Sequence, residues 1–365
     1  MTVYTWLIIL LLAAAFFMDG NTKNSKRFIF IAFLLLYVYM GLRNVNTVGA
    51  DSSGVSGSYR VIYARDGQAA WSALYGKDES NYNIGFSYLS KLIYTLTNGD
   101  YQAFVSILSF FIVFSYMRFI RKYSPSPIQS ILYFLGLLYF TFLFDALKQA
   151  MAMSVLLFAF DAIMEERPSK FVFLVLLASL FHFPALVFLP AYWLGRMRIG
   201  SYYLVFLAAL LVVTYLLRDQ ILNLMLNAYG EDEVDASMDG IRFLRNKAIV
   251  MVIIVVAAVV LRPPTAVDRV YNACLVFAGI AIVFQTFCGY NNIFERLADY
   301  YFHTSIILLP LIFEKRELDR HVLSYGDELA VKSFAPWIFC AFSIWRFLSI
   351  VNNSTFYNGF RFLWQ

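Results

Sequence analysis

Long apolar runs separated by short polar segments extend along almost the whole chain. Crossing a membrane as a helix takes about 20 apolar residues, or about 17 at the short end. Runs of about this length lie at 2–18, 27–42, 102–120, 128–147, 147–164, 201–217, 246–262, 270–288, 297–313 and 334–351. The pattern predicts an all-α integral membrane protein with about 10 spanning helices, organised as a single transmembrane domain over residues 1–365.

Residues 171–195 form one further apolar run, but it contains His182 and Pro184 near its middle. A titratable ring in such a run costs free energy, and proline disfavours helix at the residue before it. Lys170 and Arg196 give both ends of the run the positive charge typical of cytoplasmic loops. Strict alternation of loops therefore predicts a helical hairpin with His182 at its tip. A single proline-kinked helix is the alternative.

The positively charged residues of the other loops predict which loops face the cytoplasm. Basic residues gather in short loops assigned to the cytoplasm, among them Lys23, Lys26, Arg27, Arg118, Arg121 and Lys122. Both termini are then extracytoplasmic, as are a long loop at 44–100 and an acidic loop at 218–245. Within the first loop, apolar residues of Gly85–Leu96 share one helical face and predict a helix lying at the membrane interface.

Composition agrees with a membrane protein. Hydrophobic residues make up 61% of the chain and charged residues only 15%, against about a quarter in soluble domains. The net charge of +5 is spread over loops, which suits membrane orientation and not nucleic-acid binding. The three cysteines, Cys274, Cys288 and Cys340, lack metal-ligand spacing, so neither a disulfide scaffold nor a zinc site is expected. No cofactor is predicted.

The first polar constellation on the predicted outer side is GLRNVNTVGADSSG, which contains Arg43 and Asp51. A guanidinium is always charged and fits phosphate oxygens with two parallel hydrogen bonds. A carboxylate a few residues later can act as a base or orient a hydroxyl group. The alternative for Arg43 is an arginine at the helix end that reaches into lipid headgroups.

Three further constellations share that side. FLFDALKQAMAMSVLL holds Asp145, Lys148 and Gln149, and a Lys148–Asp145 ion pair is the alternative to a binding role. His182 is the second, with a neutral ring bonded between helices as its alternative. FERLADYYFHTSIILLP is the third, in which Arg296 and Asp299 have the spacing of a helical ion pair. Together these residues predict a positively charged binding site on the outer side for a polyanionic lipid headgroup such as a pyrophosphate.

The order GLR, VGAD, GFSYLSKLI, LKQAMAMSVLLFAF, SLFHFPALVFLPAY, ERLADYYFHTSIILLP and FYNGFRFLW resembles the EpsG family of Wzy-like bacterial exopolysaccharide and capsule repeat-unit polymerases. The resemblance runs from the second helix to the carboxyl terminus. It implies a metal-independent membrane glycosyltransferase of GT-C-like architecture in the bacterial cytoplasmic membrane. Such an enzyme joins oligosaccharide repeat units, carried on undecaprenyl pyrophosphate, on the extracytoplasmic face. A chain-length regulator and a repeat-unit flippase are the implied protein partners, without nucleic acid.

The resemblance also implies roles for single residues. Arg43, Lys148 and Arg296 would bind the substrate pyrophosphate, and Asp51 and His182 would be catalytic. Supporting roles fall to Gln149, Tyr59, Asp299 and Tyr300. The chain departs from the family pattern in three places: Lys148-Gln149 stands where Arg-Gln is usual, Gly54–Ser58 lengthens the segment before Tyr59, and Asn83 replaces a glutamate. The lysine keeps the charge but loses the planar fork of arginine.

Aromatic residues of the long loop, namely Trp71, Tyr75, Tyr82 and Tyr88, are candidates for stacking on sugars. Two other functions remain open from the sequence. One is a secondary transporter or flippase for a lipid-linked or anionic substrate, with a broken helix at His182. The other is a sibling enzyme, either an O-antigen ligase-like transferase or a membrane acyltransferase.

Overall fold

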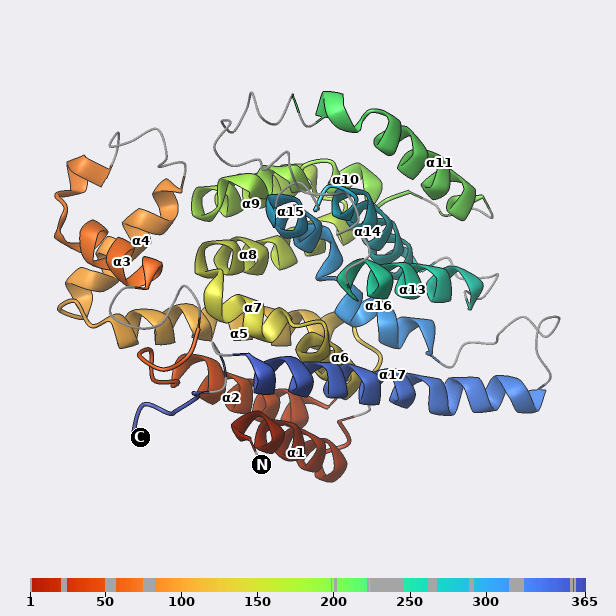
Figure 1. Ribbon diagram of the computed structural model, residues 1–365, viewed down its shortest axis with the longest axis horizontal. Coiled ribbons are helices and arrows are strands. Elements are labelled where there is room, and N and C mark those ends of the chain that lie inside the picture. The colour runs from red at the N-terminus through yellow and green to blue at the C-terminus, as the bar shows by residue number, and fades with distance from the viewer. Residues whose placement is uncertain are drawn as a thin grey trace. The chain divides into compact units, whose positions relative to one another are not determined.

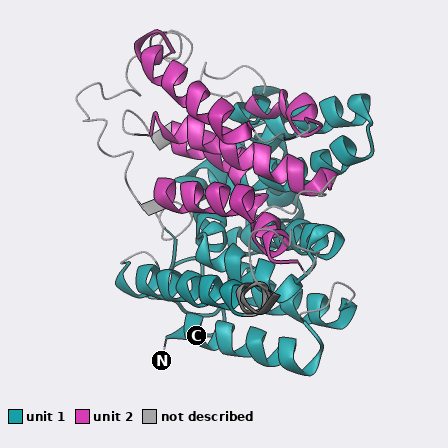
Figure 2. Ribbon diagram, turned by 90° about the vertical axis from the view of Figure 1, so that its right-hand side faces the viewer, with its two compact units in different colours: residues 1–186, 330–365 teal, residues 187–329 magenta. Residues whose placement is uncertain are grey.

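Helices form every named element of the described part of the chain, which confirms the all-α prediction. The structure is a computed structural model that describes residues 2–20, 25–49, 57–74, 83–197, 199, 202–221, 223, 246–261, 268–288, 292–314, 325–354, 357 and 359–365. The chain forms two compact units, Met1–Leu186 with Ala330–Gln365 as unit 1 and Val187–Leu329 as unit 2 (Figure 2).

Unit 1 is a bundle of long helices with a group of shorter ones at one end. Its elements are α1 (Val3–Phe17), α2 (Lys26–Gly41), α3 (Ser58–Gln68), η1 (Trp71–Leu74), α4 (Ile84–Leu96), α5 (Tyr101–Tyr123), α6 (Pro127–Gly136), α7 (Tyr139–Asp145), α8 (Leu147–Met164), α9 (Pro168–Phe181) and most of α17 (Tyr325–Asn353). Neighbouring pairs α2 and α5, α5 and α8, and α8 and α9 pack together. The helices α3 and α4 lie beyond one end of α5 (Figure 1).

Unit 2 is built around one buried helix, α14 (Arg269–Gln285). This helix packs against α10 (Ala191–Leu194), α11 (Tyr203–Leu216), α13 (Asn246–Val260), α15 (Asn292–Phe302) and α16 (Ser305–Ile312). A helix at the centre of a unit must be largely apolar around its circumference, and α14 is so apart from the buried Asn272 and Gln285. The 3₁₀ helix η2 (Phe183–Phe188) connects the two units.

Three helices of the described residues are long and apolar enough to cross a membrane: Tyr101–Tyr123, Leu147–Met164 and Phe334–Asn353. A fourth span results if the bent pair Pro127–Gly136 and Tyr139–Asp145 crosses as one. Further apolar helices of 10–17 residues follow the predicted runs, α1 and α11 among them. The apolar helices therefore support a multi-pass membrane protein, while the number of about ten spans stays a prediction.

Two runs that the sequence presents as single helices are each divided into two helices, and whether each run spans the membrane stays a prediction. Run 128–147 becomes α6 and α7, which are bent by 55° at Leu138, whose φ of 68° is left-handed. Run 297–313 divides into α15 and α16 between Phe302 and Ser305. Backbone groups freed by a break need new partners inside a membrane protein. At the first break, the Arg346 guanidinium donates to the Gly136 carbonyl at 2.8 Å.

The break at the histidine of the odd apolar segment was predicted correctly. Helix α9 ends at Phe181, His182 has extended backbone (φ −150°, ψ 106°), and η2 begins at Phe183. Pro184 explains the change, because proline disfavours helical backbone at the residue that precedes it. The chain enters unit 2 after Leu186, so the hairpin stays a prediction.

Candidate functional site

Several of the predicted site residues of unit 1 lie where α3, η1 and α4 pack near the first turn of α8 and the last turn of α9 (Figure 1). Helix α4 (Ile84–Leu96) confirms that Gly85–Leu96 is helical. Its apolar face is buried through Phe86 and Ile93. The helices of the predicted outer loop therefore rest on the bundle, and they carry charged and aromatic side chains at its end.

Lys148 lies at the centre of a group that we call the Lys148 cluster: Lys148, Phe86, Arg65 and Asp66. The half-buried Lys148 ammonium is 5.6 Å from the centroid of the Phe86 ring. It interacts with the charges of Asp66 and Arg65, which pair with each other at 2.9 Å. Aspartate and arginine thus offset one another, and the lysine adds positive charge to the cluster.

The alternative of a Lys148–Asp145 ion pair is not found among the ion pairs of the described residues. Asp145 instead accepts a hydrogen bond of 2.5 Å from the hydroxyl of Tyr357 in the carboxyl-terminal tail. Gln149, next to Lys148, is almost fully buried at 1% exposure. Lys148 is therefore the polar residue of this α8 turn that is directed to the cluster.

Arg43 occupies a different environment from the one that its position at a helix end suggests. Its side chain is fully buried, and its guanidinium donates to the backbone carbonyls of Met40 and Phe144, the latter at 3.3 Å. The guanidinium carbon is 4.6 Å from the centroid of the Phe144 ring. Burial lowers the pKa of Arg43, and the charge of Asp145 opposes that shift. Arg43 thus links the end of α2 to the end of α7.

The carboxyl-terminal tail explains why Arg43 is buried. The backbone amide of Asn44 donates to the Arg361 carbonyl at 2.9 Å, and the Leu363 amide donates to the Leu42 carbonyl at 2.9 Å. These bonds flank an isolated antiparallel bridge between Arg43 and Phe362. Sequence reasoning missed this contact, although the alternation of Phe360, Phe362 and Trp364 is a strand-like pattern that could have indicated it.

His182 is half buried at the end of α9 and adjoins α4. The Phe183 amide donates to the Asn83 side-chain carbonyl at 3.0 Å. A Cβ atom built on Gly85 would be 2.7 Å from Leu180 Cβ and 3.0 Å from the Leu180 carbonyl oxygen, so glycine allows α4 to approach α9 closely. The structure therefore brings the His182 break and the Lys148 cluster to the same helix, α4.

Two of the four aromatic residues proposed for sugar stacking lie together. Trp71 and Tyr88 are stacked with ring centroids 5.9 Å apart and an angle of 25° between their planes. Trp71 is 47% exposed, and the Lys91 ammonium is 5.5 Å from its ring centroid. Tyr75 and Tyr82 lie outside the described residues. We call Trp71, Tyr88 and Lys91 the aromatic platform.

Helix α15 of unit 2 holds the last predicted constellation. Arg296 is exposed, whereas Asp299 and Tyr300 are buried. Lys247 on α13 bridges the two acids of this helix, at 2.8 Å from an Asp299 oxygen and 3.0 Å from Glu295. Sequence reasoning missed Lys247, for which the only signal was a single lysine at the start of an apolar run.

The remaining predicted residues are Asp51 and Tyr59. Asp51 lies outside the described residues. Tyr59, in the first turn of α3, packs on Phe86 of the Lys148 cluster with ring centroids 6.0 Å apart. Among the described residues, no group of three His, Cys, Asp or Glu side chains is placed to hold a metal ion.

Comparison with known proteins gives one match. The model of the EpsG family matches residues 26–358, nearly the whole chain. No curated protein and no solved structure matches the chain. The matched range includes both the Lys148 cluster and α15.

Proposed function

Because the chain belongs to the EpsG family of Wzy-like polymerases, we propose that it polymerises oligosaccharide repeat units carried on undecaprenyl pyrophosphate. The reaction is a glycosyl transfer on the extracytoplasmic face of the bacterial cytoplasmic membrane. The family match over residues 26–358 is the observation that carries this proposal. A flippase that delivers repeat units and a chain-length regulator are its proposed partners.

In this reaction, a hydroxyl oxygen of the acceptor sugar attacks the anomeric carbon of the donor sugar. The bond from that carbon to the pyrophosphate oxygen breaks, its electron pair stays on the pyrophosphate, and the proton of the hydroxyl goes to a base. A fixed positive charge beside the leaving oxygens lowers the barrier, because it acts where negative charge develops.

Lys148 is the residue of unit 1 that we assign to the leaving pyrophosphate. Its half-buried ammonium lies against an aromatic ring at the start of a membrane-length helix, and Asp66 beside it is already paired with Arg65. The amino-terminal end of a helix adds partial positive charge in the same place. Arg296, which is exposed on α15, is the assigned phosphate ligand of unit 2.

Arg43 receives a positioning role in this proposal, because both its bonds to Met40 and Phe144 and its complete burial separate it from substrate. Asp51 is proposed as the base for the acceptor hydroxyl, on the strength of its sequence position. His182 is proposed to assist at the helix break beside α4, where Asn83 fixes the following amide. Gln149 and Tyr59 support Lys148 from α8 and α3.

The aromatic platform is proposed to bind a sugar of the acceptor. Aromatic ring faces that are exposed to solvent can pack against the C–H faces of sugars. The Trp71 side chain is partly exposed, and its ring is stacked on the ring of Tyr88. Lys91 is fixed beside it by a 2.8 Å hydrogen bond to the Gly67 carbonyl. Its ammonium can donate to sugar hydroxyls.

Replacing Trp71 with alanine should raise the KM for the acceptor repeat unit about fivefold while kcat changes little. Loss of one aromatic contact costs about 1 kcal/mol, which corresponds to about that factor. Initial polymerisation rates at varied acceptor concentration measure the effect. Trp6→Ala is the matched control, because Trp6 on α1 is 51% exposed and lies outside the platform. Equal KM values for the two variants would contradict the assignment.

The function itself is tested by reconstituting the full chain in liposomes with a defined undecaprenyl-pyrophosphate-linked repeat unit. We expect a ladder of lipid-linked polymers of increasing length, resolved by gel electrophoresis. Transfer of intact repeat units across the bilayer without any polymer would instead identify a transporter. Transfer of a single unit to a different acceptor would identify a ligase.

A further inference from the structure

A cavity of unit 1 lies between α2 and α5, away from the Lys148 cluster. It has a volume of about 720 Å³ and is lined by Lys26, Ile29, Phe30, Phe33, Phe110, Phe114, Met117, Arg118, Arg121 and Lys122. Four basic residues gather at one end of this cavity, which we call the basic pocket, and four phenylalanine rings with Ile29 and Met117 line the rest. Such a division matches a molecule with an anionic head and apolar chains.

The basic pocket lies at the opposite end of the bundle from the Lys148 cluster. Helix α5 has 23 residues and rises about 34 Å, close to the thickness of a bilayer's hydrocarbon core. At one end of α5, Gln102 and Ser106 bond to the Gly41 carbonyl beside Arg43. Arg118, Arg121 and Lys122 occupy the other end. The pocket is thus at one surface of the membrane. The basic residues at this surface assign it to the cytoplasmic side.

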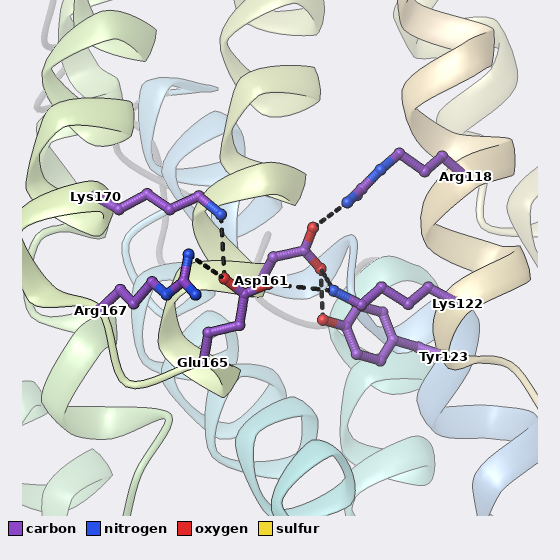
Figure 3. A network of polar contacts seen from close by, with 7 residues as sticks. All are labelled: Arg118, Lys122, Tyr123, Asp161, Glu165, Arg167 and Lys170. Carbon is purple, nitrogen blue, oxygen red and sulfur yellow. Dashed lines mark hydrogen bonds and ion pairs between the residues drawn. The ribbon is translucent and has the colours of Figure 1, made fainter.

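Acidic partners offset part of the charge of the pocket (Figure 3). Buried Asp161 on α8 binds Arg118 at 2.5 Å and Lys122 at 2.8 Å. Glu165 is shared by Lys122, Arg167 and Lys170 at 3.7, 3.6 and 3.1 Å. One buried carboxylate therefore fixes two cations of the pocket in place, and an excess of positive charge remains.

Lys26 and Arg121 are exposed cations of the pocket, as is Lys122. Neither Lys26 nor Arg121 has an ion-pair partner among the described residues, in contrast to Arg118 and Lys122. The nearby rings of Phe30, Phe110 and Phe114 are 60%, 50% and 46% exposed. Exposed aromatic rings next to cations that lack an ion-pair partner are the arrangement expected where the phosphate and acyl chains of a lipid contact a protein.

From this arrangement we propose that the basic pocket binds one anionic glycerophospholipid of the cytoplasmic leaflet. The phosphodiester lies between Lys26 and Arg121, with Arg118 and Lys122 behind it. The acyl chains run along the rings of Phe30, Phe33, Phe110 and Phe114. The site is separate from the polymerisation site and its occupancy does not depend on glycosyl transfer.

The test compares lipid binding to the full chain, purified in detergent and freed of lipid, by mass spectrometry of the intact protein. Phosphatidylglycerol and phosphatidylcholine with identical acyl chains are the probes. We expect one phosphatidylglycerol to bind at least tenfold more tightly than phosphatidylcholine. The double variant Lys26→Gln, Arg121→Gln should weaken phosphatidylglycerol binding about 30-fold, since each basic residue contributes about fivefold.

The control is the double variant Arg27→Gln, Arg167→Gln, which removes the same charge from exposed residues that do not line the pocket. Its phosphatidylglycerol binding should match that of the unaltered chain. An equal loss in both double variants, or equal binding of the two lipids, would overturn the proposal. Displacement of the lipid by inorganic phosphate at the same concentration would also overturn it, because phosphate supplies the charge without the chains.

Discussion

Replacement of Asp161 by asparagine should lower the free energy of unfolding by about 3 kcal/mol. Asp161 is a buried carboxylate inside α8 that binds Arg118, Lys122 and, at 2.5 Å, the hydroxyl of Tyr123. Asparagine keeps the shape but removes the charge, so both cations lose their shared counter-ion. Breaking a buried ion pair costs about 3–5 kcal/mol, and the lower value applies because Arg118 and Lys122 reach solvent.

Unfolding in mixed micelles with an increasing fraction of denaturing detergent measures this loss. Glu165→Gln is the matched control, one turn further along the chain, and should change the free energy by less than about 0.5 kcal/mol because its ion pairs are at the surface. Combining Asp161→Asn with Lys122→Met should recover part of the loss. If Asp161→Asn and Glu165→Gln shifted the unfolding transition equally, the buried ion pairs of Asp161 would not stabilise the fold more than the surface ion pairs of Glu165.

Lys148→Met should lower the polymerisation rate by about 10²–10³-fold, the usual effect of removing one group that stabilises developing charge. Lys148→Arg should cause a much smaller loss, because the charge is kept and the guanidinium fits phosphate oxygens. Because the charge develops as the bond breaks, both kcat and kcat/KM should fall together. Initial rates with the reconstituted chain and a defined repeat unit give both constants.

The matched control is Lys170→Met, which removes an exposed lysine at the start of α9, beyond the other end of α8. That variant should polymerise at the unaltered rate. Size-exclusion elution and helical circular dichroism separate misfolding from lost chemistry. A folded Lys148→Met variant with a normal rate would remove Lys148 from the site.

The sequence predicted the helices well, because apolar runs of membrane length are a local signal. Runs 27–42 and 147–164 correspond to α2 and α8 within one residue. The break at His182 was also predictable, since Pro184 acts on its immediate neighbours. The break at Leu138 has no proline at the bend, and the Gly136 carbonyl beside it is bonded by Arg346 of α17, 210 residues further along the chain.

Contacts between distant segments likewise explain the differences at the candidate site. The sequence places Arg43 at a helix end, where an arginine ordinarily meets water or headgroups. Its burial results from the tail, whose pairing with Leu42 and Asn44 has no local signal near Arg43. Lys247 and Asp299 are far apart in sequence, so their ion pair has no local signal.

The pairing of the tail with Leu42 and Asn44 also has a consequence for biosynthesis. Unit 1 is interrupted by Val187–Leu329, so the segment that covers Arg43 is synthesised long after Arg43 itself. At about 5–20 residues per second, the end of α2 waits on the order of ten seconds or more for that partner. Membrane insertion of the first helices therefore precedes closure around Arg43, and unit 1 is completed only after the whole of Val187–Leu329 has been synthesised.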